Sequence, residues 1–159
     1  MEQAGPYFST NGIAMLYLFA AIFIFLFLST AESQPGPRHL EEVVYDTERN
    51  RLILFGGVEH QKENWIEPSS VHEWDGNNWT IPEVPGPIGR RAGGLVYDAG
   101  TKETFLFGGV ATGKVQPDSV LLDAWKWDGK NWKKLNTTCP VKEPEATYDP
   151  VNKRILVYG

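Results

Sequence analysis

One unit of about fifty residues occurs twice in this chain and begins a third time. Each copy opens with a Tyr-Asp pair, passes through a polar turn and continues into an apolar segment that ends in glycine. The tyrosines are Tyr45, Tyr97 and Tyr148, and 52 and then 51 positions separate successive ones. A fixed period of this length indicates a repeat architecture, in which each unit buries its apolar surface against its neighbours.

The second half of each complete copy carries the pattern Trp-Asp-Gly-x-Asn-Trp after a pair of glycines. The recurring residues are Gly56, Gly57, Trp74 and Trp79 in the first copy and Gly108, Gly109, Trp127 and Trp132 in the second. Asp-Gly between two aromatic segments predicts a tight hairpin, because glycine adopts positive φ without steric cost. A large aromatic ring removes roughly 150–250 Å² from water when it is buried, so we expect the tryptophans to supply much of the core.

Two short apolar runs, residues 52–55 and 104–107, follow polar segments rich in Asp, Asn and Gly. Short apolar runs bounded by turn residues predict buried strands. The polar segments, residues 46–50 and 98–102, predict hairpin turns capped by aspartate side chains. We expect the glycine pairs to lie where a neighbouring backbone approaches closely.

The glycine pair, the spaced tryptophans and the period together resemble the kelch motif, over residues 35–159. The resemblance implies an all-β fold of kelch-type β-propeller blades, each with four strands. It predicts two nearly complete blades and the first hairpin of a third, with repeats at about residues 38–84, 90–138 and 142–159, the last incomplete. Propellers close with about 4–8 blades. We therefore interpret residues 38–159 as a partial propeller, either the N-terminal part of a longer protein or the product of a truncated gene model.

An apolar leader precedes the repeats. No charged side chain occurs from Gln3 to Ala31, and residues 13–28 are unbroken apolar sequence. This length falls between a signal-peptide core and a membrane-spanning helix. Residues 1–31 are therefore interpreted as a hydrophobic helix that is either a signal peptide or a membrane anchor through residues 13–31, and residues 32–37 as a linker. The protein is expected to be secreted after cleavage or, alternatively, to be a single-pass membrane protein.

Charge and motif content narrow the class of partner. The formal net charge is −5, and the chain has no basic cluster, which argues against nucleic acid as a partner. The three histidines, His39, His60 and His72, form no metal-ligand spacing with one another or with the single cysteine, Cys139. We expect no metal site and no cofactor in this chain. Cys139 is interpreted either as the partner of a cysteine elsewhere in a longer protein or as a free thiol.

No constellation for catalysis emerges from the sequence. Asp75 and Asp128 are a pair of carboxylates, but each occupies the same predicted turn of its own repeat, which explains both without chemistry. The residues that open the repeats are basic or contain imidazole and are expected to form a polar rim at one end of the fold. They are Arg38, His39, Arg90 and Arg91.

Two Asn-x-Thr triplets make Asn78 and Asn136 candidate glycosylation sites in an exported protein. The longest predicted loops, residues 58–70 and 110–123, differ from each other while the strands around them repeat, and variable loops on a fixed scaffold are where binding usually takes place. Trp65 and Ile66 in the first loop are either recognition residues or a cover for the neighbouring repeat.

We therefore predict a non-catalytic binding scaffold whose loops meet a protein or carbohydrate ligand. The alternative is a fragment of a copper enzyme similar to galactose oxidase, whose central domain is also a kelch propeller and whose copper ligands would lie outside this chain. No motif in this sequence matches the copper site of that family.

Overall fold

The computed structural model describes residues 34–112 and 119–159. All regular elements of this part are β-strands in antiparallel sheets, so the prediction of an all-β fold is confirmed for it. The predicted N-terminal helix lies outside the described residues. Within them, no helix has the length and apolar character needed to cross a membrane.

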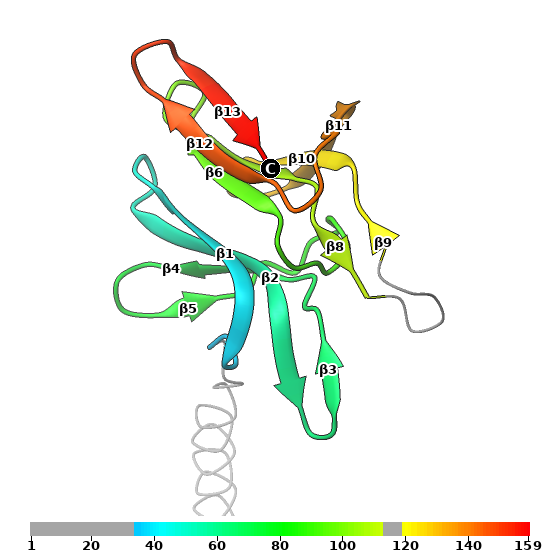
Figure 1. Ribbon diagram of the computed structural model, residues 1–159. Coiled ribbons are helices and arrows are strands. Elements are labelled where there is room, and N and C mark those ends of the chain that lie inside the picture. The colour runs from blue at the N-terminus through cyan, green and yellow to red at the C-terminus, as the bar shows by residue number, and fades with distance from the viewer. Residues whose placement is uncertain (1–33, 113–118) are drawn as a thin grey trace, which may run out of the picture. The chain divides into compact units, whose positions relative to one another are not determined.

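The first sheet is an antiparallel meander whose strands pair in chain order (Figure 1). Its path runs through β1 (Arg38–Asp46), β2 (Arg51–Gln61), β4 (Val71–Trp74) and β5 (Trp79–Thr80). A fifth strand, β3 (Asn64–Ile66), pairs with the far end of β2 and lies off this path. The β1–β2 turn and the β4–β5 turn fall on the polar segments that the sequence marks as turns.

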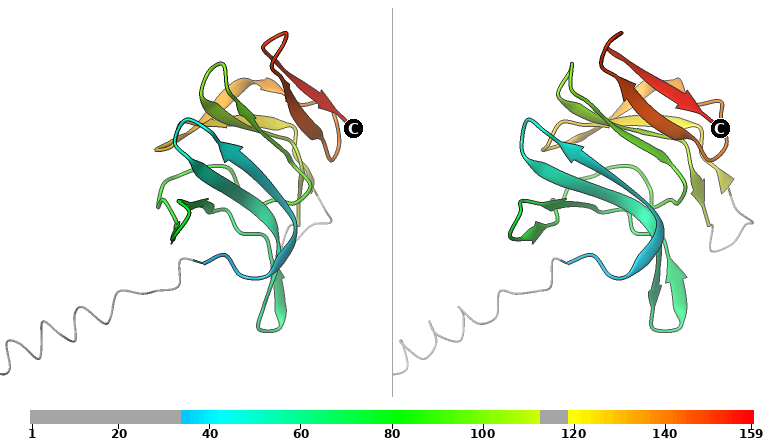
Figure 2. Two further views of the ribbon diagram at one scale, coloured as in Figure 1. Left: turned by 90° about the vertical axis from the view of Figure 1, so that its left-hand side faces the viewer. Right: turned by 60° about the vertical axis from the view of Figure 1, so that its left-hand side comes forward.

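The second sheet repeats this strand order through β6 (Gly94–Asp98), β7 (Glu103–Phe107), β10 (Asp123–Trp127) and β11 (Trp132–Thr138). A small hairpin of β8 (Val110–Ala111) and β9 (Ser119–Val120) stands between β7 and β10. A third hairpin follows, made of β12 (Glu145–Asp149) and β13 (Arg154–Tyr158). Figure 2 shows the first sheet, the second sheet and the third hairpin stacked in chain order.

Aspartate side chains hold the turns, as the sequence predicts. Asp75 Oδ1 accepts the backbone N–H groups of residues 77 and 78, and Asp128 Oδ1 accepts those of residues 130 and 131. Asp46, Asp98 and Asp149 bind the backbone of their own turns in the same way. These bonds replace water at backbone donors that the tight turns leave unpaired.

Each sheet has two faces that can be followed through the register, because successive side chains point to opposite sides of a strand. We call the side with the recurrent Tyr and Trp residues the front face. In the first sheet one row of it is Tyr45, Leu52, Trp74 and Trp79, and in the second sheet the same row is Tyr97, Thr104, Trp127 and Trp132. The opposite side is the back face, which in the first sheet carries Ile53, Phe55 and Val71.

The core forms where the back face of the first sheet packs on the front face of the second. Its buried members are Ile53, Phe55, Val71, Leu95, Leu106, Trp127 and Trp132, with Val44, Val84 and Trp125 packed around them. Phe55 and Trp132 meet edge to face with ring centroids 5.3 Å apart. The front face of the third hairpin packs on the back of the second sheet in turn, since a Cβ added to Gly94 would lie 3.1 Å from Ala146 Cβ.

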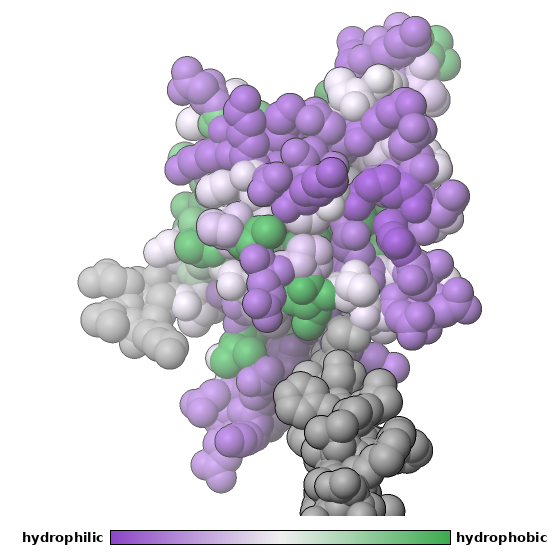
Figure 3. All heavy atoms as spheres, turned by 180° about the vertical axis from the view of Figure 1, so that it is seen from behind, coloured by the Kyte–Doolittle hydropathy of each residue, from purple (hydrophilic) through white to green (hydrophobic). Residues whose placement is uncertain are grey.

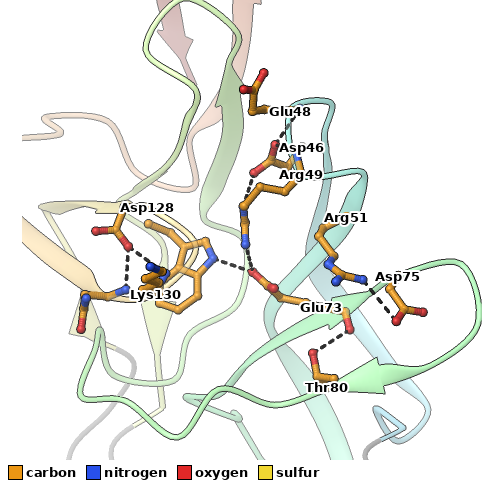
Figure 4. Close-up of polar contacts among 11 residues, drawn as sticks. Asp46, Glu48, Arg49, Arg51, Glu73, Asp75, Thr80, Asp128 and Lys130 are labelled. Carbon is orange, nitrogen blue, oxygen red and sulfur yellow. Dashed lines mark hydrogen bonds and ion pairs between the residues drawn. The ribbon is translucent and has the colours of Figure 1, made fainter.

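A buried polar network joins the first two sheets across this core (Figure 4). Glu73 Oε1 accepts the indole N–H of Trp127 at 2.8 Å and an Arg49 guanidinium N–H at 2.7 Å. Arg49 also donates to Asp46 at 2.7 Å. Burial alone would lower the pKa of Arg49, but the hydrogen bonds that it donates to Glu73 and Asp46 outweigh burial and hold that pKa above its usual value. The front-face tryptophan of the second sheet is therefore fixed by a charged acceptor on the back of the first.

At the glycine pairs, the chain segment that precedes the next repeat packs closely against the backbone. Gly56 has φ +71°, and a Cβ there would lie 2.3 Å from the Arg90 carbonyl oxygen. That same carbonyl accepts the Gly57 N–H at 2.8 Å. The close backbone approach expected at these glycines is thus present, and any larger residue at Gly56 would push the two repeats apart.

The predicted polar rim is wrong for two of its four members, because the side chains of Arg38 and Arg90 are only 4% and 1% exposed. Arg90 is 1% exposed, and its guanidinium binds the Gly108 carbonyl at 2.9 Å and the Asp123 carboxylate at 2.6 Å. Arg38 binds the Gly56 carbonyl at 3.2 Å. Each arginine thus donates a hydrogen bond to the carbonyl of the first glycine of its own repeat. The tight turn at the glycine pair leaves this carbonyl inside the fold, and the arginine side chain is long enough to reach it.

Candidate ligand-binding face

Two hairpins extend from the sheets between their second and third path strands. β2 continues past the sheet to Gln61 and returns as β3, and β8 returns as β9. The sequence predicted a loop over residues 58–70, but this prediction is wrong for residues 58–66, which form the end of β2, a turn and β3. The reason is local pairing: His60 faces Trp65 across the ribbon, and Lys62 takes φ +56° in the turn.

A hollow of about 640 Å³ lies between these two hairpins. Its apolar wall is formed by Val58, Trp65, Ile66, Ile88 and Ala111. Trp65 is 65% exposed and Ile88 is 57% exposed, so two large apolar side chains stay in water here. In Figure 3, apolar side chains on the view from behind gather in patches framed by hydrophilic ones. Large contiguous apolar patches on a protein surface mark sites of interaction, so this wall is a candidate binding surface.

The Glu67 carboxylate fixes the polar side of the hollow. Its Oε2 accepts the Thr112 backbone N–H at 2.6 Å, and its Oε1 accepts the Thr112 hydroxyl at 2.9 Å and an Arg91 guanidinium N–H. Arg91 also pairs with the Val110 backbone in both directions. One carboxylate thus ties the segment after β3 to Thr112 at the end of β8, and so joins the two walls of the hollow.

Imidazole rings flank the exposed tryptophan. The centroid of the Trp65 ring lies 4.7 Å from that of His60 and 5.6 Å from that of His39. His39 is registered with Val58 on β1 and β2. These contacts restrict the orientation of the indole while one of its surfaces stays exposed, which gives a partner a rigid aromatic platform at low entropic cost.

Of the two interpretations of Trp65 and Ile66, the exposure of Trp65 favours the recognition role over the covering role. Sequence reasoning missed Ile88 and Glu67. Ile88 had a recognisable signal, since it is an isolated large apolar residue in a segment rich in Pro and Gly between the repeats. Glu67 had none, because its partners lie 24 and 45 positions away in the chain.

The remaining candidate residues lie away from the hollow. His72 is buried on the first sheet, and burial together with the positive charge of Arg38 lowers its pKa. Cys139 is a buried free thiol at 3% exposure, and its backbone N–H binds the Leu122 carbonyl at 2.8 Å. The glycosylation candidates are both exposed, Asn78 in the β4–β5 turn and Asn136 on the edge strand β11.

Asp123, Asp75 and Asp128 each make hydrogen bonds within the fold. Burial alone would raise the pKa of the Asp123 carboxyl, but hydrogen bonds from Arg90 and Trp125 outweigh it and hold that pKa below its usual range. Asp75 and Asp128 remain in their separate turns. No group of three or more His, Cys, Asp or Glu side chains within residues 34–112 and 119–159 is arranged to hold a metal ion.

No protein-family model matches this chain, and a search of curated proteins finds no related sequence.

Proposed function

We propose that this chain is part of a kelch-type β-propeller that acts as a non-catalytic binding scaffold, exported or tethered to a membrane by its leader. The hollow between the β2–β3 and β8–β9 hairpins is its ligand site, and the ligand is a protein or a carbohydrate. The single observation that carries the proposal is that the exposed Trp65 and Ile88 line one hollow whose walls are joined by Glu67.

Three features support the propeller interpretation. The two complete sheets share one strand order, they stack back to front, and an arginine before each sheet reaches the first glycine of its repeat. Repeated sheets stacked in this way give a rigid base, and loops that differ between repeats can then carry specificity.

The properties of the hollow support binding as its role. A volume of about 640 Å³ falls within the range of about 300–1,000 Å³ that is typical of ligand sites. Its wall is mostly apolar, with few polar groups beside it, and tryptophan is the side chain most enriched among residues that dominate binding energy. A flat indole also stacks on the apolar face of a sugar ring, so both ligand classes remain in the proposal.

The test is a binding screen of the full chain against a displayed peptide library and a glycan array. Ligands recovered with the wild type are then measured by titration calorimetry against Trp65→Ala and Ile88→Ser. Each substitution should weaken binding by about tenfold or more, which corresponds to removal of a central contact.

Val151→Ser is the matched control, because Val151 is 85% exposed and lies in the β12–β13 turn. It should leave the affinity unchanged. Ligands that bind Trp65→Ala and Ile88→Ser as tightly as the wild type would place the site elsewhere, and a screen without any ligand of either class would contradict the proposed function.

Export has its own check. Asn78 and Asn136 are accessible, so a chain that passes through a eukaryotic secretory route should carry glycans that an endoglycosidase removes, with a shift in electrophoretic mobility. Asn78→Gln and Asn136→Gln together should abolish that shift.

A further inference from the structure

The outer strand of the second sheet, β11, has an open edge. It pairs with β10 and with no other strand of residues 34–112 and 119–159, so it forms the margin of its sheet (Figure 1). The two repeats differ here, because β11 has seven residues and no proline, whereas β5 has two residues and Pro82 follows it closely. A short strand and a proline are two ways in which proteins close a sheet edge, and only the first sheet uses them.

Stacking of neighbouring units does not cover this edge. The first sheet packs on the front of the second sheet and the third hairpin packs on its back, whereas hydrogen-bonding groups at a strand edge point sideways, within the plane of the sheet. The first sheet shows what a complete neighbour does to an outer strand. Its back packs on the second sheet, yet Thr80, which is the counterpart of Lys133, remains exposed. A complete third sheet would therefore leave β11 accessible in the same way.

The register identifies which backbone groups face the open edge. The Asp128 N–H donates to the Asn131 carbonyl at 3.3 Å, and Trp127 and Trp132 are the next pair along the two strands. Hydrogen-bonded and non-hydrogen-bonded pairs alternate along an antiparallel ladder. Trp132 and Lys134 are thus at non-hydrogen-bonded positions relative to β10, and their backbone N–H and C=O groups point to the open edge. These groups are the donors and acceptors that an added strand needs.

The charge on this edge decides what can be added to it. Lys130 in the preceding turn, Lys133 and Lys134 are exposed, and residues 129–138 contain no Asp or Glu. Within the described part of the chain, lysine forms ion pairs at Lys102, Lys126 and Lys142 and not at Lys130 or Lys133. The same edge of a second copy would set lysine against lysine, which is repulsive. An acidic segment is therefore the complement of this edge.

We propose that a partner protein adds an extended acidic segment to this edge, as an extra strand paired with residues 132–134. The backbone groups of Trp132 and Lys134 bind the segment, and Lys133 then takes a non-hydrogen-bonded position of the new pair, where facing side chains come closest. A partner Asp or Glu opposite Lys133 completes a cross-strand charge pair. This site is separate from the hollow at Trp65 and does not depend on it.

A second hollow continues from the paired stretch. The register of β10 and β11 shifts between Asp123, which faces Thr138, and Trp125, which faces Lys134. At this irregularity a hollow of about 570 Å³ is lined by residues 122–123 and 134–138. Leu122 in its lining is 47% exposed, so the hollow offers apolar contact to a partner side chain beyond the charge pair.

The test is a titration of the full chain in detergent micelles with two labelled peptides, followed by fluorescence anisotropy. One peptide alternates valine and glutamate over about eight residues, which is enough for one strand, and the other has lysine in place of glutamate. The chain is produced in bacterial cells, so that Asn136 carries no glycan. The acidic peptide should bind with saturation, and the basic peptide should not bind.

Two substitutions test the two parts of the proposal. Lys133→Glu reverses the charge that faces the partner, so it should weaken binding of the acidic peptide by about fivefold or more and allow the basic peptide to bind. Lys134→Pro deletes an N–H that faces the open edge, and an edge strand tolerates proline at such a position. It should weaken binding by about tenfold or more. Lys134→Ala removes the same charge but keeps the N–H, so it should weaken binding much less.

Controls separate this site from general effects of charge and folding. Lys62→Glu in the β2–β3 turn and Trp65→Ala in the hollow should bind both peptides like the wild type. Equal circular dichroism melts would show that the variants are folded. Hydrogen exchange of the wild type gives a readout without any substitution, because the Trp132 and Lys134 amides should exchange more slowly once the acidic peptide is bound.

Four results would overturn the proposal. They are absence of saturable binding of the acidic peptide to the folded wild type, undiminished binding to Lys133→Glu, and unchanged exchange of the Trp132 and Lys134 amides in the complex. The fourth is a single-stranded oligonucleotide that binds as tightly as the acidic peptide and binds Lys134→Pro equally well. That result would mean that the lysines attract polyanions without strand pairing.

Discussion

Replacing Trp127 with alanine tests the central packing of the two sheets. Trp127 is 1% exposed, lies in the core between the back of the first sheet and the front of the second, and donates its indole N–H to Glu73 at 2.8 Å. The substitution removes the ring from that core and deletes one of the two hydrogen bonds that hold the Glu73 carboxylate. Arg49 remains bound to Glu73 at 2.7 Å, so the carboxylate keeps a charged partner.

The expected loss follows from these contacts. Deletion of a buried Trp side chain costs about 3–5 kcal/mol of unfolding free energy, because the transfer free energy is lost and the cavity collapses only in part. A total stability of about 5–15 kcal/mol is typical of a domain, so Trp127→Ala is expected to leave little of it. Trp127→Phe keeps most of the apolar burial and should cost about 1–3 kcal/mol, mainly for the lost hydrogen bond to a charged acceptor.

Urea unfolding of the full chain, followed by circular dichroism at low protein concentration, measures both values. Trp74→Ala is the matched control, because Trp74 is the counterpart of Trp127 on the front of the first sheet but is only partly buried. It should cost no more than about half as much as Trp127→Ala. Equal losses at the two positions, or a loss under about 1 kcal/mol for Trp127→Ala, would refute the assignment of the core to this pair of faces.

Two further perturbations address buried charge. Burial, reinforced by the negative charge of Glu145, raises the pKa of Glu42 from 4.5 to about 8. The folded chain then keeps a proton that the unfolded chain releases, so stability should fall as pH rises from about 4.5 to about 8, by up to about 1.4 kcal/mol per pH unit and less where solvent screens the charge. Glu42→Gln should flatten this dependence in urea titrations at several pH values, and an unchanged slope would show that Glu42 ionises normally. Arg90→Met should destabilise the fold by about 3–5 kcal/mol, since it removes the charged partner of the Asp123 carboxylate and leaves it only the Trp125 indole N–H. A double-mutant cycle with Asp123→Asn should give a coupling above about 0.5 kcal/mol. Additive effects in that cycle would show that the 2.6 Å contact contributes little.

The local features of the fold could be predicted from the sequence because their causes are local. Aspartates at the turns bind backbone groups two or three residues away, and the apolar runs between turns form strands. None of these inferences required knowledge of what packs against what.

The site was harder to predict. The sequence pointed to residues 58–70 and 110–123 as variable segments, and the hollow does lie between them. It gave no sign that Glu67 joins them through Arg91 and Thr112, because a contact between residues this far apart depends on how the repeats stack. Ile88 completes the apolar wall for the same reason.

Turn chemistry and apolar runs thus determined by themselves that residues 34–112 and 119–159 form antiparallel strands joined by tight turns, since these features depend on residues that are neighbours in sequence. Tertiary structure alone decided that Arg38 and Arg90 are buried and that Trp127 is covered while Val43 and Tyr45 are not. The physical reason is that burial depends on which sheet lies over a given face, and the front faces of the first and second sheets differ in that respect.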